Sequence, residues 1–176
     1  RLELPPEEET AAMLAAAMER LPAAGLRQYE VASFAKPGAE SRHNLNYWRN
    51  GIYLGLGAAA HSRIGRRRWA NLTDPSAYVA ALARGVSPAA WEEELTEEDE
   101  LLETVMLGLR LREGLDLSLF PRRFGREAET IFGPALRGLC RAGLLRTDGG
   151  RLRLTQAGIP LADYVLRTLI SGSGSP

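Results

Sequence analysis

The chain has 176 residues, a length that allows one domain or two small ones. Its 22 Lys and Arg balance 22 Asp and Glu, which argues against a nucleic-acid module or a membrane anchor held by bulk positive charge. The single cysteine, Cys140, excludes an internal disulfide and any metal site built from several thiolates, and it indicates a reducing, cytoplasmic setting. No apolar run approaches the roughly 18 residues that a transmembrane helix needs.

The first half of the chain alternates predicted helices and strands. Leu14, Met18 and Leu21 recur at helical spacing and predict an amphipathic helix over residues 6–23 that ends at Gly25. Five further elements follow: a strand over 27–34, a short helix or ordered loop over 41–49, a buried strand over 53–57, a hairpin over 61–72, and a helix capped by Asp74 that stops at Gly85.

The second half is mainly helical. Thr96 and Asp99 fit a capping box, which predicts that a helix follows and stops at Gly114. The remaining predictions are a short helix over 117–120, a helix over 127–142 disturbed at Gly133-Pro134, a hairpin over 144–154, a helix from Thr155 to about 170, and a flexible tail over 171–176. This order of helices and hairpin is typical of a winged helix.

These elements predict an α+β protein with two parts and a tail. Residues 1–90 have too few strands to close an α/β sheet, and the open edge would leave backbone groups unpaired. We therefore expect that preceding sequence supplies neighbouring strands, an expectation that fits the opening residues, which read as mid-chain sequence. Residues 91–170 form the winged-helix-like part.

The densest candidate site is His43-Asn44-Leu45-Asn46-Tyr47-Trp48, where an imidazole, amides, a phenol and an indole lie within six residues. Neutral imidazole is a ligand for iron, and flat aromatic side chains stack on planar macrocycles. If the stretch is helical, His43 and Tyr47 share a face. The alternative is structural: Tyr47 and Trp48 fill a core or an interface, and His43 bonds a backbone carbonyl.

The other candidates each have a structural interpretation that fits better than the functional one. His61 either lines a pocket or closes a tight turn, and Gly55-Leu56-Gly57 fits a close-packed strand end better than a phosphate loop. A basic cluster could meet propionates or phosphates, or form a solvated hairpin tip; it consists of Arg63, Arg66, Arg67 and Arg68 with Trp69. Cys140 lies on the apolar face of its helix, which indicates inert core.

The winged-helix order also raises DNA binding. Residues 99–170 hold 11 arginines against nine acidic residues. The expected recognition helix, 126–142, carries three arginines offset by two glutamates and has no Asn or Gln to reach base edges. We therefore expect no nucleic-acid partner.

The motif order resembles the HemW family, the radical-SAM-related heme chaperones long described as oxygen-independent coproporphyrinogen III oxidases. The residues that carry the resemblance in the first half are the runs 29–38, 43–48 and 53–57 and Ala60-His61-Ser62, in which H-N-x-x-Y-W is the element that separates the chaperones from the true oxidases. In the second half they are 106–110, Gly114-Leu115, 143–145, 152–155 and Gly158. Two positions depart from the family: Ala59 stands where glycine is usual, and Ser33 where asparagine is common.

The resemblance implies the last part of a radical-SAM (β/α) barrel over 1–90, followed by the C-terminal domain. It implies a protein that binds heme and delivers it to respiratory hemoproteins, reaching membranes only through those partners. The roles within this stretch follow from side-chain chemistry: His43 is the candidate axial metal ligand, Tyr47 and Trp48 are stacking or propionate-side groups, and Asn44 is a hydrogen-bonding group that orients its partner. Whether the protein forms a homodimer is left open by the sequence.

The family's cysteine loop for a [4Fe–4S] cluster and most of its S-adenosylmethionine site are not in this chain. We therefore expect no radical catalysis from this chain alone. The alternative function is that of part of an oxygen-independent coproporphyrinogen III oxidase in porphyrin biosynthesis, against which the H-N-x-x-Y-W element argues.

Overall fold

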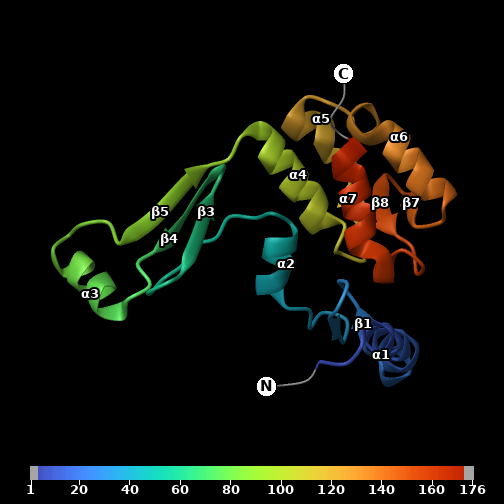
Figure 1. Ribbon diagram of the computed structural model, residues 1–176, viewed down its shortest axis with the longest axis horizontal. Coiled ribbons are helices and arrows are strands. Elements are labelled where there is room, and N and C mark those ends of the chain that lie inside the picture. The colour runs from blue at the N-terminus through green and yellow to red at the C-terminus, as the bar shows by residue number, and fades with distance from the viewer. Residues whose placement is uncertain (1–3, 173–176) are drawn as a thin grey trace. The chain divides into compact units, whose positions relative to one another are not determined.

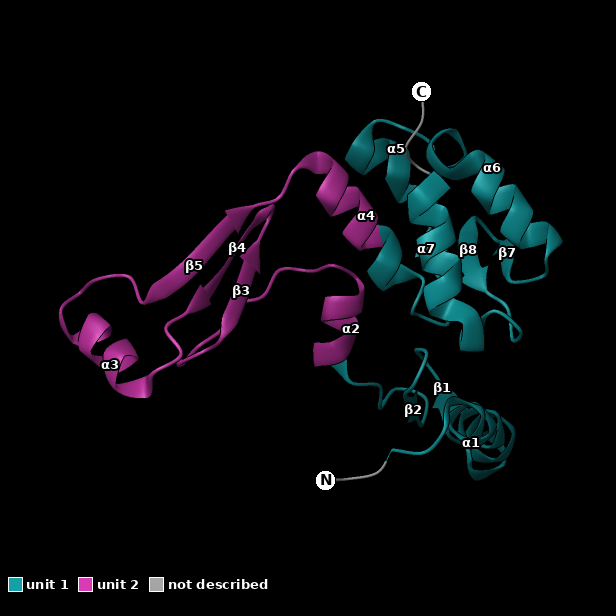
Figure 2. Ribbon diagram, in the orientation of Figure 1, with its two compact units in different colours: residues 1–42, 105–176 teal, residues 43–104 magenta. Residues whose placement is uncertain are grey.

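The structure is a computed structural model that describes residues 4–172. Its chain divides into two compact units, shown in different colours in Figure 2. One unit combines the residues up to 42 with those from 105 onward, and the other comprises residues 43–104. Helices and strands occur in both units (Figure 1), which confirms the prediction of a mixed α and β fold.

The first unit begins with helix α1 (Glu7–Arg20), whose first turn contains three glutamates beside the positive end of the helix dipole. A 3-10 turn, η1 (Leu21–Ala24), extends it, and Gly25 ends it in the left-handed conformation with φ of 75°. The predicted helix over 6–23 and its end at Gly25 are therefore confirmed.

The predicted single strand over 27–34 is wrong. The segment folds back on itself as two short antiparallel strands, β1 (Arg27–Gln28) and β2 (Phe34–Ala35). Local bonds close the turn between them: Gln28 Nε2 donates to the Val31 carbonyl at 2.8 Å, and the buried Glu30 carboxylate accepts from Ala32 N–H at 3.2 Å. These side chains satisfy the backbone that a longer strand would have needed to pair.

The rest of the first unit packs helices against a three-stranded antiparallel sheet of order β6-β8-β7. Its elements after helix α4 (Glu97–Gly108) are β6 (Leu115–Asp116), α5 (Leu119–Phe124), α6 (Ala128–Arg141), β7 (Leu145–Asp148), β8 (Arg151–Leu154), η2 (Ile159–Leu161) and α7 (Ala162–Gly172). Phe120 and Phe132, with ring centroids 6.3 Å apart, are fully buried in its core, as are Leu152 and Leu169. The predicted hairpin over 144–154 is confirmed.

Helix α6 continues through Pro134, so the predicted disturbance there does not end the helix. The apolar face of the helix, with Ile131, Leu136 and Leu139, is buried and holds it in place despite the missing backbone donor. Helix α4 (Glu97–Gly108) ends before the predicted stop at Gly114, because a turn and β6 follow. Of the predicted tail over 171–176, residues 171 and 172 belong to helix α7, which ends at Gly172. Residues 173–176 lie outside the described part of the chain.

The second unit contains most of helix α2 (Arg42–Trp48), a sheet of order β3-β4-β5, helix α3 and the start of α4. The bounds are β3 (His61–Ile64), β4 (Arg67–Asn71), α3 (Pro75–Ala83) and β5 (Ala89–Glu94). The hairpin turns at Gly65 as predicted, and the Asp74 carboxylate caps α3 by accepting from Ala77 N–H at 2.7 Å. Strand β5 was not predicted, since its acidic composition is unusual for a strand.

The predicted buried strand over 53–57 is also wrong. Only one bridge, Tyr53 with Arg63, joins it to β3, and alternate apolar side chains are exposed: Ile52 by 66%, Leu54 by 63% and Leu56 by 82%. Side chains replace a strand ladder here, because Gly55 N–H donates to Ser62 Oγ at 2.9 Å and Asn71 Nδ2 donates to the Gly57 carbonyl at 2.9 Å.

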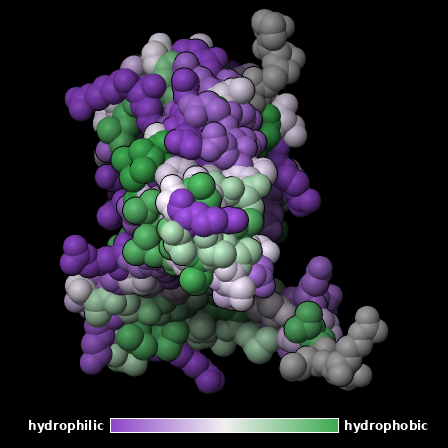
Figure 3. Space-filling view, turned by 90° about the vertical axis from the view of Figure 1, so that its left-hand side faces the viewer, coloured by the Kyte–Doolittle hydropathy of each residue, from purple (hydrophilic) through white to green (hydrophobic). Residues whose placement is uncertain are grey.

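Helix α3 presents apolar residues to its surroundings as well. Val79 and Leu82 on the helix and Val86 just after it are exposed, and Figure 3, which looks onto the side of the molecule that carries α3, shows apolar and charged side chains intermixed there. No helix within residues 4–172 is both long and apolar enough to cross a membrane.

Candidate functional site

Helix α2 brings together two of the four predicted site residues. His43 lies in its first turn and is exposed, and Tyr47 lies one turn later and is half-buried. Their rings meet edge to face with centroids 4.7 Å apart at 89°, as the four-residue spacing predicts for a helix. The Tyr47 ring in turn contacts Tyr53 at 4.6 Å and 69°. An imidazole therefore stands at the exposed end of a row of three aromatic rings.

The imidazole of His43 forms no hydrogen bond with any residue that the structure describes, so the predicted alternative of a bond to a backbone carbonyl does not apply within that range. Asn44 is exposed on the same helix, and Trp48 at its end is half-buried. Both ring nitrogens of His43 can accordingly meet an outside partner.

The end of α2 is fixed by Asn50. This buried residue has φ of 54°, a left-handed conformation that asparagine tolerates better than most residues, and its N–H donates to the Tyr47 carbonyl at 2.9 Å. Beside it, Gly51 N–H donates to the Asn46 carbonyl at 2.9 Å, and Asn46 Nδ2 donates to the Ile52 carbonyl at 2.9 Å. The helix that carries His43 is thus tied down at its C-terminal end.

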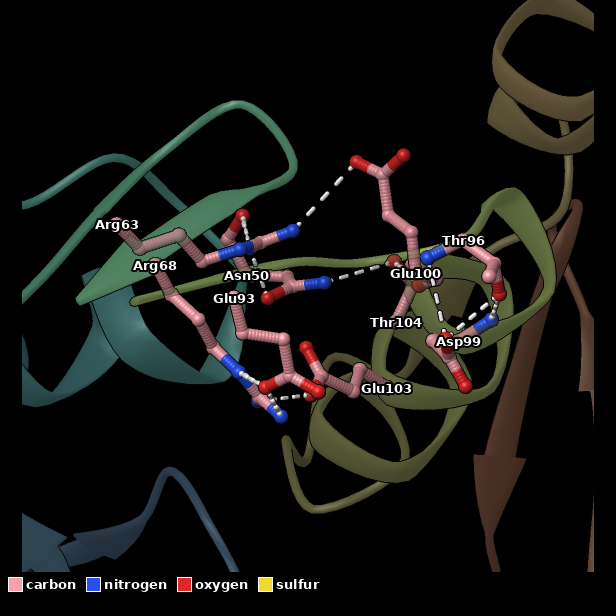
Figure 4. Close-up of polar contacts among 9 residues, drawn as sticks. All are labelled: Asn50, Arg63, Arg68, Glu93, Thr96, Asp99, Glu100, Glu103 and Thr104. Carbon is pink, nitrogen blue, oxygen red and sulfur yellow. Dashed lines mark hydrogen bonds and ion pairs between the residues drawn. The ribbon is translucent and has the colours of Figure 1, made fainter. Parts of the chain in front are cut away.

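A buried polar network holds Asn50 in turn, as Figure 4 shows. One guanidinium nitrogen of Arg63 donates to both the backbone carbonyl of Asn50, at 2.7 Å, and its side-chain Oδ1. The other meets the Glu100 carboxylate at 3.5 Å. Asn50 Nδ2 donates to Thr104 Oγ1 at 3.0 Å, and that hydroxyl donates to the Glu100 carbonyl at 2.7 Å. Arg63 therefore links β3, the end of α2 and helix α4.

The other arginines of the predicted basic cluster face carboxylates on strand β5 and, for Arg68, on helix α4 as well. Arg68 bonds Glu93 at 2.7 Å and Glu103 at 2.6 Å (Figure 4), while Arg67 meets Glu92 at 2.6 Å. Because these carboxylates already occupy the guanidinium groups, the structure disfavours the prediction that the cluster meets propionates or phosphates. The solvated interpretation fits the exposed Arg67 and is wrong for Arg63, which is buried.

The ring row includes one phenol whose ionisation is suppressed. Burial raises the pKa of Tyr53, and the neighbouring Tyr47 raises it further, against smaller opposing effects of Arg63 and Arg68. Tyr53 therefore stays a neutral phenol across the physiological pH range. The sequence did not predict that Tyr53 adjoins the site, because the contact between the Tyr47 and Tyr53 rings depends on how helix α2 packs against the segment that follows it.

The described residues contain no group of three or more His, Cys, Asp or Glu able to hold a metal ion. Heme iron needs only one axial ligand from the protein, so a single exposed histidine fits it. An iron–sulfur cluster does not fit this chain, because it requires several thiolates and the sequence has one cysteine. Partial burial raises the pKa of Cys140, which lies on α6.

Comparisons with known proteins agree on one family. Residues 95–161 match the model of the HemN C-terminal domain. The heme chaperone HemW of Bacillus subtilis is 37% identical over 165 residues, which are 94% of this chain and 44% of that protein. HemW of Mycobacterium tuberculosis is 41% identical over 151 residues, which are 86% of this chain and 37% of that protein.

A solved structure gives the same answer for the fold. Coproporphyrinogen III oxidase (HemN) from Escherichia coli, a radical SAM enzyme, superposes on this chain with a TM-score of 0.72 and 19% sequence identity. The superposition covers 96% of this chain and 42% of the HemN chain. The chain thus has the fold of the C-terminal region of the radical SAM proteins related to HemN. Within that class it belongs to the HemW family and corresponds to the C-terminal part of its members. It spans less than half the length of the HemW relatives described above.

Proposed function

We propose that this chain is the heme-binding C-terminal part of a heme chaperone, and that His43 is the axial ligand of the heme iron. One observation carries the proposal: an exposed imidazole, without a hydrogen bond to any described residue, stands on α2 against a row of aromatic rings. A histidine with a structural role is usually buried or hydrogen-bonded. The HemW relatives are named heme chaperones, and this identifies heme as the proposed ligand.

The other residues of α2 have supporting roles in this proposal. Tyr47, held by Tyr53 behind it and His43 in front, fixes the orientation of the imidazole and offers an apolar edge to a macrocycle. Trp48 contributes stacking area, and the exposed amide of Asn44 hydrogen-bonds polar groups of the cargo such as propionates. Asn50 and Arg63 hold the helix in place without contacting heme.

The wider proposal concerns the whole protein. Residues 1–90 are the last part of a (β/α) barrel, and 91–170 are a winged-helix-like domain. The full protein holds its [4Fe–4S] cluster and S-adenosylmethionine outside this chain and delivers heme to respiratory hemoproteins from the cytoplasm. The HemW relatives and the structural likeness to a radical SAM enzyme support this scheme.

The test is a heme titration followed by absorbance in the Soret region, with the fold of each variant checked by circular dichroism. We expect His43→Ala to shift the Soret maximum and to weaken binding at least tenfold, because the axial ligand is lost. Tyr47→Phe keeps the ring and should change affinity by less than threefold, whereas Tyr47→Ala should weaken it further.

The matched control is His61→Ala. The chain has two histidines, and His61 is likewise exposed, at the start of β3. Its replacement should leave both the spectrum and the affinity unchanged. If His61→Ala reproduces the spectral change and a folded His43→Ala does not, the assignment of the ligand is wrong.

A further inference from the structure

The first unit places arginines against one another on its small sheet. Strands β7 and β8 pair so that Arg146 lies directly opposite Arg153, and such like-charge pairs are destabilising in an antiparallel sheet. The alternate positions Leu152 and Leu154 are buried, so Arg153 lies on the opposite face from the core. The register therefore places two positive charges side by side on the face of the sheet away from the core.

A third arginine adjoins this pair. Arg112 follows helix α4, and its backbone N–H donates to the Tyr29 carbonyl at 3.0 Å. Arg153 is tied to the same segment, because its Nε donates to the Glu113 carbonyl at 3.0 Å. Partial burial lowers the pKa of Arg112, and the positive charges of Arg146 and Arg153 lower it further. No acidic group has a comparable effect on it among the described residues.

The charges around this point do not balance. Arg153 pairs with Asp148 at 3.1 Å, and the nearby Arg151 pairs with Asp116 at 3.6 Å. The guanidinium groups of Arg112 and Arg146 form no hydrogen bond or ion pair with any residue from 4 to 172. Two positive charges are therefore uncompensated, and one of them, Arg112, is half-buried. In the basic cluster of the other unit, by contrast, Arg67 and Arg68 have carboxylate partners.

We propose that Arg112, Arg146 and Arg153 form a binding site for a dianionic phosphate group, either the phosphate ion or a phosphate monoester. The guanidinium fork matches the oxygens of phosphate, and a monoester carries about −1.5 to −2 charges at pH 7, which neutralises the two uncompensated arginines. A carboxylate or a phosphodiester has a single charge and would leave one of them unbalanced. This site uses no residue of α2 and goes beyond the proposed heme function.

The experiment titrates the full chain with inorganic phosphate by calorimetry at pH 7.5, with sodium chloride holding the ionic strength constant. Parallel titrations use methyl phosphate, dimethyl phosphate and acetate. We expect the first two to bind and the last two to bind at least tenfold more weakly. Methyl phosphate binding as tightly as phosphate identifies a monoester site, and weaker binding identifies a site for the free ion. Equal binding of all four anions overturns the proposal.

Variants separate binding from structure. Arg112→Gln should weaken phosphate binding at least tenfold, and without phosphate it should leave the thermal midpoint unchanged or raise it, because repulsion and burial of charge are relieved. The matched control is Arg141→Gln, an exposed arginine of α6 that should keep full binding.

The opposite pattern refutes the site. If Arg112→Gln lowers the midpoint without phosphate and keeps the phosphate affinity, the arginine is structural. Loss of phosphate binding in both variants alike would show that general positive charge is responsible. The heme spectrum of Arg112→Gln should match that of the unaltered chain, so a failure of one proposal is distinguishable from a failure of the other.

Discussion

Replacing Asn50 should destabilise the second unit and loosen the helix that carries His43. The side chain of Asn50 both accepts from the buried Arg63 guanidinium and donates to Thr104 Oγ1, and its backbone occupies a left-handed conformation with φ of 54°. Asn50→Ala removes all three contributions, whereas Asn50→Gly removes only the two side-chain bonds. Comparing the two variants therefore isolates the backbone contribution.

The magnitudes follow from the contacts. A hydrogen bond to a charged group contributes about 1.5–3 kcal/mol and a neutral one about 1 kcal/mol. Alanine in the left-handed region costs about 1 kcal/mol more than asparagine or glycine. We expect the free energy of unfolding to fall by about 4 kcal/mol in Asn50→Ala and by about 3 kcal/mol in Asn50→Gly. Thr73→Ala, at an exposed position of the same unit, should change it by less than about 0.5 kcal/mol.

Tryptophan fluorescence during urea unfolding measures this effect in the correct unit. All three tryptophans of the chain, Trp48, Trp69 and Trp91, lie within residues 43–104, so their emission reports that unit alone. A loss below about 1 kcal/mol in Asn50→Ala would show that the network contributes little. A glycine variant less stable than the alanine variant would refute the backbone argument.

Two further predictions concern local conformation. Ala59 is exposed with φ of 59°, so Ala59→Gly should raise the free energy of unfolding by about 1 kcal/mol in the same urea assay, and a decrease would contradict the strain. Hydrogen bonds from the Thr96 hydroxyl and N–H hold the pKa of Asp99 below its usual range. The cap therefore stabilises α4 above the ordinary aspartate pKa of about 3.9, and the stabilisation is lost as the pH falls through the lower folded value. Helix content measured by circular dichroism should depend less on pH below 4 in Thr96→Ala, and an unchanged acid transition would exclude the cap as its cause.

Local signals explain which elements the sequence could predict. The caps at Asp74 and Thr96 and the left-handed stop at Gly25 depend on residues within four positions of one another, and all three formed as predicted. The shared face of His43 and Tyr47 has the same origin, because one helical turn separates them. Such features need no knowledge of distant contacts.

The strands failed where side chains competed with the ladder. Over 27–34, Gln28 and Glu30 bond the backbone of the turn, and over 53–57, Ser62 of β3 and Asn71 of β4 bond the backbone. A hydrophobic pattern shows which residues favour burial, but it does not show which backbone groups a polar side chain will satisfy. The sequence did not predict the partners of Arg63 either, because Glu100 lies 37 positions away and only the fold brings the two side chains together.

The balanced net charge of the chain does not show how the charges are paired locally. Zero overall charge argues against partners bound by bulk attraction, yet it allows local excesses wherever pairing is incomplete. In the second unit, the register of β4 with β5 places Arg67 and Arg68 against the acidic strand, and Glu92 and Glu93 neutralise them. In the first unit, the register of β7 with β8 opposes two arginines instead. The arginines thus have different uses in the two units, because strand register, rather than composition, decides which guanidinium groups can meet an anion from outside.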